Sequence, residues 1–308
     1  MKIKNITGSF CRKCLQESIP VDLMVRFAKI VSPEYDLYKR TGLNEGMAIS
    51  NQDAARRVVA DLIRDGQYID FVEALIQIDA KGYMGRRYTL KGLNDVVSGV
   101  IQEGYTFDRA SGQFFENQNE RITDNWGRLK DGDERMMAVL RLDVVSNSSL
   151  VKQNSAKSVD KAYRDLRNIV TQSVVYRLGR LWSWEGDGAL AVFLFGYKEK
   201  AAVYAGMNIL HELYFYNRLD NPLNNPIKVR LAVHMGPVRY WNNTLERIKN
   251  ETVKETVLIE SQATPADALG VSHNVFLSID RGIQELFSGE KSFPGGRVRN
   301  YTFGMEKA

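Results

Sequence analysis

From residue 135 onward, the sequence alternates between segments with the two-residue period of a β-strand and segments with the 3.6-residue period of an α-helix. This alternation limits the fold more than any other feature, because each strand must find neighbours and each helix must cover a sheet face. The predicted order is β-α-ββ-α-β-(β)-α-β, an α+β sheet covered mainly on one side. Its segments are RMMAVLRLDVV (135–145), SVDKAYRDLRNIVTQSVVYRLG (158–179), RLWSWEGDGALAVFLF (180–195), KEKAAVYAGMNILHELYFYN (198–217), IKVRLAVHMGPVRYW (227–241), NETVKETVLIESQ (250–262), ALGVSHNVFLSI (268–279) and GRVRNYTFG (296–304).

The N-terminal part has a different pattern, in which several amphipathic helices precede one hairpin. NQDAARRVVADLIRDG (51–66) predicts a helix capped by Asn51 or Asp53. GYTFDRASGQFFEN (104–117) predicts two short strands around a Ser-Gly turn. A polar, turn-rich segment follows, so we expect a helical N-terminal domain over 1–130 and a second domain over 131–308. A regulatory or dimer-supporting role is expected for the first domain, with DNA binding by a winged-helix-like module as the weaker alternative.

Composition excludes several functional classes. The net charge of +5 and pI of about 9.0 favour anionic ligands but do not imply nucleic acid. The longest apolar run, GALAVFLFGY (188–197), has about half the length needed to cross a bilayer, and the sequence begins without a hydrophobic signal segment. We therefore expect a soluble, cytoplasmic protein with no membrane contact. Cys11 and Cys14 lack the further ligands of a structural zinc site and are expected to be reduced thiols.

Two aspartates occupy positions that suit metal-phosphate chemistry. Asp143 ends the first strand of the second domain, and Asp187 lies in the tight turn EGDG. If the two strands are neighbours, both carboxylates emerge at one edge of the sheet, where they repel each other unless a cation lies between them. Magnesium is typically held by one or two carboxylates together with substrate phosphates. The residues SNSS after Asp143 can cap a helix and present backbone N–H groups to phosphate.

Each aspartate also has a purely structural explanation. Asp favours hairpin turns, and it is a common helix cap. The metal-site interpretation therefore depends on sequence patterns of longer range.

Those longer patterns resemble the catalytic domain of the class III nucleotidyl cyclases. DVVSNSSL (143–150) is similar to the family's D-[IV]-V-G-F-T-S-L, and YRLGRLWSWEGDGALAVF (176–193) supplies a carboxylate 44 residues after Asp143. VRLAVHMGPV (229–238) resembles VRIGIHTGPV, and TPADALGVSHNVF (264–276) resembles the segment after the family's last catalytic helix. The resemblance implies a ferredoxin-like βαββαβ core, preceded here by a mainly helical domain with a β-hairpin.

The resemblance also implies an activity and a set of site residues. The expected reaction is attack of the ribose 3′-oxygen on the α-phosphorus of a nucleoside triphosphate, with release of pyrophosphate. Asp143 and Asp187 would be the catalytic ligands of two divalent ions, Mg²⁺ or Mn²⁺, with the carbonyl of Val144 completing one metal site. The β- and γ-phosphates would contact the backbone N–H groups of Ser146, Asn147, Ser148 and Ser149. Because the family's sites lie between two catalytic domains, a homodimer is expected.

The residues that read a purine in the family are absent. Ser183 stands where the family has Lys or Glu, and Arg247 lies near the place of the second purine contact. The family's transition-state Asn and Arg would fall at Lys254 and Leu258. These departures resemble the Pycsar pyrimidine cyclases of bacterial anti-phage defence, which implies cyclic UMP or cyclic CMP as product and a separate effector that senses it. UTP is favoured over CTP, and Ser183, Arg230, Arg247 and Lys254 are the candidates for base or transition-state contacts.

Two other functions remain open. The domain could be an adenylate or guanylate cyclase with an unusual base pocket, or a non-catalytic nucleotide-binding module of cyclase-like fold. The aromatic side chains of Trp182, Trp184 and Tyr176 could stack on a base, or pack in the core or at a dimer interface. For His234 we expect a packing role.

Overall fold

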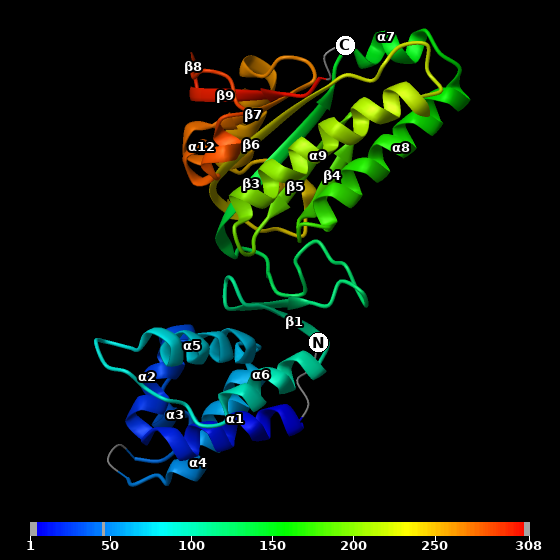
Figure 1. Cartoon of the computed structure of the whole chain (residues 1–308). Helices are drawn as coiled ribbons and strands as arrows, with labels where there is room; N and C mark the ends of the chain where they lie inside the picture. Colours follow the sequence, from blue (N-terminus) through cyan, green and yellow to red (C-terminus); the bar gives the residue numbers. More distant parts are fainter. Residues whose placement is uncertain (1–4, 45–46, 305–308) are drawn as a thin grey trace. The chain divides into compact units, whose positions relative to one another are not determined.

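The computed structural model describes residues 5–44 and 47–304, and along the chain they divide into two compact units between Ile122 and Thr123. The units are described separately. The first is helical and ends in the predicted hairpin, whose strands pair antiparallel (Figure 1). Its elements are α1 (Asn5–Ser18), α2 (Val21–Val31), α3 (Leu37–Thr41), α4 (Asn51–Arg64), α5 (Tyr68–Lys81), α6 (Leu93–Gln102), β1 (Tyr105–Asp108) and β2 (Gln113–Glu116).

The start of α4 differs from the sequence prediction. The cap is Ser50, which precedes both predicted residues, because its hydroxyl oxygen accepts the Asp53 amide at 3.1 Å. The same hydroxyl donates to the Asp53 carboxylate at 2.8 Å. Asp53 therefore supports the cap through the Ser50 hydroxyl, but Ser50 is the cap residue.

The second unit contains a seven-stranded sheet with the order β4-β5-β3-β6-β7-β9-β8. The first four strands in this order, with α8 and α9 as connections, make the antiparallel βαββαβ arrangement of a ferredoxin-like core. The predicted fold class is thereby confirmed, as is the helical region before it. The strands are β3 (Glu134–Val144), β4 (Arg180–Glu185), β5 (Gly188–Phe193), β6 (Val229–Arg239), β7 (Ala268–Ser272), β8 (Lys291–Phe293) and β9 (Gly296–Thr302).

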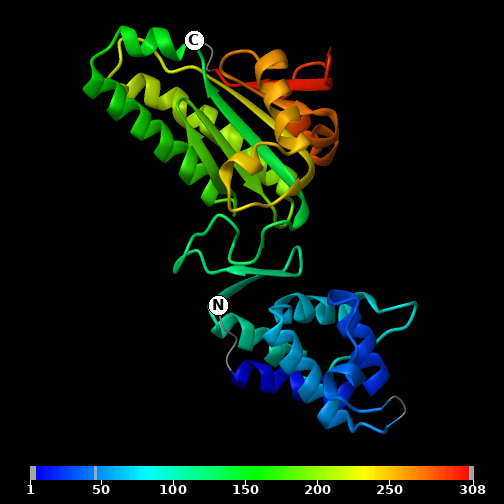
Figure 2. The ribbon, with the colours of Figure 1, turned by 180° about the vertical axis from the view of Figure 1, so that it is seen from behind.

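Helices cover the two sheet faces unequally. The long helices α8 (Ala156–Val175) and α9 (Lys198–Leu219) pack over one face and enclose the main hydrophobic core (Figure 1). On the other face, the segment after β6 crosses the sheet, and its helix α11 (Glu251–Leu258) contacts β6 and β3 (Figure 2). The remaining helical elements are α7 (Asn147–Lys152), α10 (Thr244–Arg247), a π-helical turn (Ile259–Ala263), α12 (His273–Ser278) and α13 (Arg281–Gln284).

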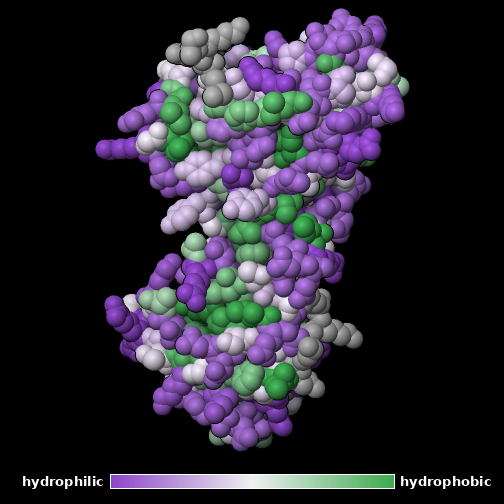
Figure 3. Space-filling view, turned by 45° about the vertical axis from the view of Figure 1, so that its right-hand side comes forward, coloured by the Kyte–Doolittle hydropathy of each residue, from purple (hydrophilic) through white to green (hydrophobic). Residues whose placement is uncertain are grey.

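The two-residue period of β3 determines which side chains reach each face. Leu140, Leu142 and Val144 are buried in the core beneath α8 and α9. Arg141 and Asp143 alternate with them, so they lie on the opposite face of the sheet. On the molecular face seen in Figure 3, hydrophobic side chains form separate groups among hydrophilic ones.

Candidate functional site

Asp143 and Asp187 lie at the same end of two adjacent antiparallel strands. Asp143 stands opposite Gly188, the first residue of β5, and Asp187 immediately precedes that residue. The turn before it needs Gly186, whose φ of 58° lies in the left-handed region that glycine adopts without strain. The condition on which the sequence argument depended, neighbouring strands for the two carboxylates, is therefore met.

A tyrosine of α8 lies near both carboxylates. The Tyr163 hydroxyl donates to the Asn147 side-chain oxygen at 2.5 Å. Burial raises the pKa of Tyr163 to about 12, and the negative charges of Asp187 and Asp143 act in the same direction. Both aspartates are thus within electrostatic reach of one hydroxyl group.

Arg230 forms an ion pair with Asp143 across the β3–β6 ladder. The two residues are directly opposite each other, and Arg230 Nη2 donates to Asp143 Oδ2 at 2.6 Å. Both side chains are partly buried, with 30% and 21% of their surfaces exposed. A charge-assisted hydrogen bond in this setting is stronger than one between fully exposed side chains, because water screens it less.

Glu260 is a buried carboxylate on the other side of Arg230. It lies in the π-helical turn, a type of element that occurs frequently at functional sites. Its Oε1 is 2.7 Å from Arg230 Nε, and its side chain is 5% exposed. Burial raises the pKa of Glu260 above its ordinary value, and Arg230 is the strongest opposing influence. Arg141, Asp143 and Asp187 also contribute to this shift, so all of these charges share one neighbourhood.

Arg141 completes the group and explains Gly188. A Cβ atom at position 188 would lie 2.3 Å from Arg141 Nη2, so the guanidinium rests against the start of β5. We call the charged side chains at this edge of the sheet the rim cluster: Arg141, Asp143, Asp187, Arg230 and Glu260. It combines carboxylates that can hold a cation with guanidinium groups that can face an anion.

Asp143 and Asp187, two of the acidic members of the rim cluster, fit a magnesium-type site completed by a substrate. Within residues 5–44 and 47–304, no three His, Cys, Asp or Glu side chains are grouped so as to hold a metal by themselves. Two carboxylates without a third protein ligand are the set that Mg²⁺ or Mn²⁺ uses when phosphate oxygens supply further ligands. Val144, predicted to add its carbonyl, is the last residue of β3 and pairs with Val229.

The loop after Asp143 leads directly into α7. Ser146 has a φ of 57°, which is uncommon for a residue other than glycine. Its carbonyl accepts the amide of Ser149 at 3.0 Å. The amides of Ser146, Asn147 and Ser148 are therefore better placed for phosphate than that of Ser149, since the last is engaged in the turn.

The remaining predicted contact residues lie on different elements of the second unit. Ser183 follows a β-bulge in β4 and stands opposite Leu190. Lys254 pairs with Glu251 at 2.6 Å and is largely exposed. Of the four base or transition-state candidates, Arg230 forms a direct hydrogen bond with Asp143, at 2.6 Å.

Arg247 is buried in a cluster of its own. Its guanidinium carbon lies 5.1 Å from the centre of the Trp182 ring and 5.0 Å from that of Tyr240. It also donates to Asp124 Oδ2 at 3.1 Å, while the Trp182 indole donates to the Asp124 carbonyl at 3.0 Å. These contacts tie the beginning of the second unit to β4, so Arg247 and Trp182 have packing partners that account for both side chains.

The other aromatic residues differ in exposure. Trp184 is half-buried against the main core, with Arg167 over its ring, whereas 84% of Tyr176 is exposed. His234 lies between Ser272 Oγ, 2.9 Å from its Nδ1, and Glu255 Oε2, 2.7 Å from its Nε2. Because Ser272 is buried, this arrangement serves to join β6, β7 and α11.

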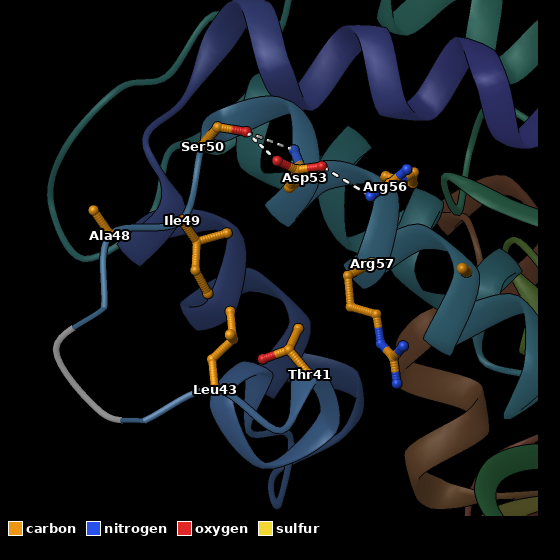
Figure 4. Close-up of a pocket in the computed structure, with 9 residues that line it drawn as sticks. Thr41, Leu43, Ala48, Ile49, Ser50, Asp53, Arg56 and Arg57 are labelled. Carbon is orange, nitrogen blue, oxygen red and sulfur yellow. Dashed lines mark hydrogen bonds and ion pairs between the residues drawn. The ribbon is translucent and has the colours of Figure 1, made fainter.

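The first unit has a separate open pocket at the start of α4, with a volume of about 570 Å³. Leu43, Ile49 and Arg57 point toward it from α4 and the segment before that helix (Figure 4). Both of its arginines have acidic partners: Arg56 pairs with Asp53 at 2.8 Å, and Arg57 with Asp61 at 3.1 Å. The pocket therefore offers apolar surface without an uncompensated positive charge.

Sequence reasoning missed Arg141, Tyr163 and Glu260. The period of β3 was a usable signal for Arg141, because it places residues 141 and 143 on one face. Tyr163 and Glu260 reach the rim from helices distant in sequence, so no local pattern marks them. Among the described parts of the chain, no helix has both the length and the apolar character required for a transmembrane span.

Comparisons with known proteins found similarity to solved structures alone. No family model matches the sequence, and no curated protein matches it. The solved structures with similar chains include the guanylyl cyclase Cya2, with 18% identity over 56% of this chain and 93% of that one, at a TM-score of 0.47. The monomeric guanylyl cyclase domain of the RhoGC fusion protein from the aquatic fungus Blastocladiella emersonii has 14% identity over 56% and 98%, at 0.47. The adenylyl cyclase CyaB from P. aeruginosa has 14% identity over 57% and 98%, at 0.45.

Proposed function

We propose that residues 131–308 form a class III nucleotidyl cyclase domain that converts a pyrimidine nucleoside triphosphate, UTP in preference to CTP, into a 3′,5′-cyclic monophosphate and pyrophosphate. The observation that carries this proposal is the register of β3 and β5. It puts Asp143 opposite Gly188 and thus beside Asp187, so two carboxylates share one rim of the sheet. The cyclase-like motifs around both residues in the sequence support the same function.

The chain's own residues would do the following in this reaction. Asp143 and Asp187, with the Val144 carbonyl, would hold Mg²⁺ or Mn²⁺, which when bound lowers the pKa of a hydroxyl and neutralises phosphate charge. The amides of Ser146, Asn147 and Ser148 would bind the β- and γ-phosphates and orient the triphosphate. The ribose 3′-hydroxyl loses its proton to solvent and its oxygen forms a new bond to the α-phosphorus, as the bond to the pyrophosphate oxygen breaks. Positioning and charge stabilisation are the protein's main contributions.

Base selection is assigned to Ser183. Its hydroxyl both donates and accepts hydrogen bonds, so it suits the mixed donor and acceptor edge of a pyrimidine. Ser183 stands opposite Leu190 on β5, two residues from Gly188, which puts it on the strand pair that carries Asp187. Lys254 on α11 remains a candidate for a transition-state contact, because its ammonium, which pairs with Glu251, is exposed and accessible to a second copy of the chain.

A homodimer is proposed as the active form. Apolar side chains are exposed on α10, in the connection after it and on α11, and surfaces of this kind are used in association. These residues are Leu245, Ile248, Val257 and Leu258, with exposed fractions of 63, 39, 38 and 40%. The helical domain would support or regulate this dimer. We further propose that the cyclic nucleotide is a second messenger in antiviral defence, sensed by a separate effector.

The direct test is incubation of the full chain with ATP, GTP, CTP and UTP separately, with Mg²⁺ or Mn²⁺, followed by identification of products by mass. UTP should give cyclic UMP and pyrophosphate, with CTP as the weaker substrate. Asp143→Ala and Asp187→Ala should each abolish the product while the thermal unfolding profile stays cooperative. Turnover of ATP or GTP alone would instead support a purine cyclase with an unusual base pocket. Nucleotide binding without any turnover would support a non-catalytic module.

A further inference from the structure

Arg230 is held by two carboxylates that act on different edges of its guanidinium. Nη2 contacts Asp143 Oδ2 at 2.6 Å, and Nε lies 2.7 Å from Glu260 Oε1. The first contact is a hydrogen bond, whereas the second is an ion pair without hydrogen-bond alignment. Within the described residues, Arg230 Nε and Glu260 Oε1 accordingly have no hydrogen-bond partner. The guanidinium is thus oriented to form a hydrogen bond with Asp143, whereas its contact with Glu260 lacks hydrogen-bond geometry.

A divalent cation on Asp143 would compete with this arrangement. The Oδ2 atom that accepts from Arg230 is one of the two oxygens with which Asp143 can bind a cation. Positive charges within a few ångströms of one another repel strongly in a partly buried setting, because screening by water is weak there. Cation binding therefore favours movement of the guanidinium away from Asp143.

Glu260 provides the place to which the guanidinium can move. Its side chain is 5% exposed and lies in the π-helical turn, so it stays buried beside Arg230. A small rotation of Arg230 would convert its misaligned ion pair with Glu260 into a hydrogen bond. The buried carboxylate would then remain compensated, which avoids the large cost of an unpaired buried charge.

We propose that Arg230 and Glu260 form a counter-ion switch that sets the affinity of the Asp143–Asp187 site for divalent cations. Arg230 neutralises Asp143 and lowers its cation affinity, and Glu260 takes over the guanidinium when a cation binds. This inference rests on the proposed metal site, but it assigns to two side chains a role in regulating that site. Both are positioning residues, because they act on the cation through Asp143.

The test measures Mn²⁺ binding directly, from the electron paramagnetic resonance signal of free Mn²⁺ titrated with the full chain and no nucleotide. Arg230→Gln should tighten Mn²⁺ binding roughly tenfold, because it removes the competing charge-assisted hydrogen bond. Glu260→Gln should weaken binding roughly threefold or more, because it leaves Arg230 with Asp143 as its remaining partner. Arg297→Gln is the matched control: this arginine pairs with Glu290 at 3.1 Å and is not part of the rim cluster.

The double variant Arg230→Gln/Glu260→Gln separates a switch from simple charge summation. In a switch, Glu260 acts through Arg230, so Glu260→Gln should change Mn²⁺ affinity less than twofold once Arg230 is absent. Independent effects that multiply, with no coupling between the two sites, would overturn the proposal. If the single Glu260→Gln variant does not fold, the comparison of Arg230→Gln with the double variant still decides, since the double variant removes both buried charges together.

The same measurements distinguish failure of the switch from failure of the proposed function. The switch would be rejected and the cyclase retained by three results together. Mn²⁺ binding would be lost in Asp187→Asn, the effects of the Arg230 and Glu260 substitutions on Mn²⁺ affinity would be independent, and the chain would still turn over a nucleotide. Coupling without turnover of any of the four nucleotides would support the switch and reject the cyclase. Arg297→Gln should match the original chain within experimental error in each case.

Discussion

The hydroxyl of Tyr163 on α8 donates to the side-chain oxygen of Asn147, 2.5 Å away, at the first turn of α7. This contact connects a long core helix to the loop that follows Asp143. Since Ser146 adopts a left-handed conformation, the loop needs support from outside its own backbone. Tyr163 provides that support and lies near both candidate metal ligands.

Tyr163→Phe should therefore lower catalytic efficiency without unfolding the domain. A neutral hydrogen bond contributes about 0.5–1.5 kcal/mol, which corresponds to a loss of roughly two- to twelvefold in kcat/KM if the loop positions phosphate. The measurement is steady-state cyclisation of UTP alongside thermal unfolding. Tyr216→Phe is the matched control, because its hydroxyl also contacts α8, at Asp165, but at 3.0 Å and away from the rim cluster. Equal activity losses in the two variants would argue for a general effect of destabilisation.

Arg247 should prove important for stability through its shape as well as its charge. Arg247→Ala removes a buried guanidinium placed against two aromatic rings and leaves Asp124 without this partner. We expect a loss of about 2–4 kcal/mol in the free energy of unfolding, and Arg247→Lys should recover less than half of it, since an ammonium lacks the planar face. Denaturant unfolding measures both variants. Lys249→Ala, which removes an exposed pair with Glu246, should change stability by less than about 0.5 kcal/mol. Full recovery by lysine would show that charge alone matters.

A residue's role could be predicted from the sequence where it depends on neighbouring residues in the chain, and could not where it depends on contacts made in the fold. The strand periods and the chain order predicted an α+β sheet, whereas the ferredoxin-like core was implied by the resemblance to the cyclases. The Gly-Asp-Gly turn predicted a shared edge for Asp143 and Asp187 on the condition, met in the structure, that their strands are neighbours. The partners of those carboxylates were harder to predict from the sequence. Arg230 meets Asp143 through cross-strand register, and Glu260 arrives from a π-helical turn, so their contacts depend on tertiary packing. Arg247 was a candidate for base contact because it lies near the position of the family's second purine contact. Its packing partners Trp182, Tyr240 and Asp124 are brought together only in the fold, so the sequence did not show them.

Two helical glycines provide a paired test of packing around the core. A Cβ at Gly206 of α9 would lie 2.8 Å from a methyl carbon of Leu269, whereas one at Gly282 of α13 would meet nothing within 4 Å. Gly206→Ala should lower the free energy of unfolding by about 1–3 kcal/mol, because overpacking outweighs the gain in helix propensity. Gly282→Ala should be neutral or stabilising by up to about 1 kcal/mol. Chemical denaturation compares them, and a stabilised Gly206→Ala variant would contradict the close approach of α9 to β7.

The link between α8 and α9 should weaken in acid. The hydrogen bond from Lys161 lowers the pKa of Asp165, and Tyr216 acts in the same direction. A carboxyl whose pKa is lower in the folded state stabilises the fold above its unfolded pKa of about 4, and that contribution is lost as pH falls through the folded pKa. Asp165→Asn should therefore cost stability at pH 7 and cost progressively less below about pH 4. Urea unfolding at both pH values measures the difference, with Asp160→Asn, at an exposed position of the same helix, as the control. A cost independent of pH would exclude a role for the ionised carboxylate.

The two thiols of the helical unit should be unreactive while that unit is folded. Cys11 and Cys14 are free cysteines of α1 and have at most 1% of their surface exposed. Burial raises the pKa of Cys14 to about 11 and that of Cys11 further, so almost no thiolate is present at pH 8. We expect labelling by a thiol-specific disulfide reagent to be negligible in the native protein at pH 8 and complete in denaturant, as measured by absorbance of the released thiolate. Rapid labelling of either cysteine under native conditions would contradict the packing of α1 against α4 and α6 that encloses them.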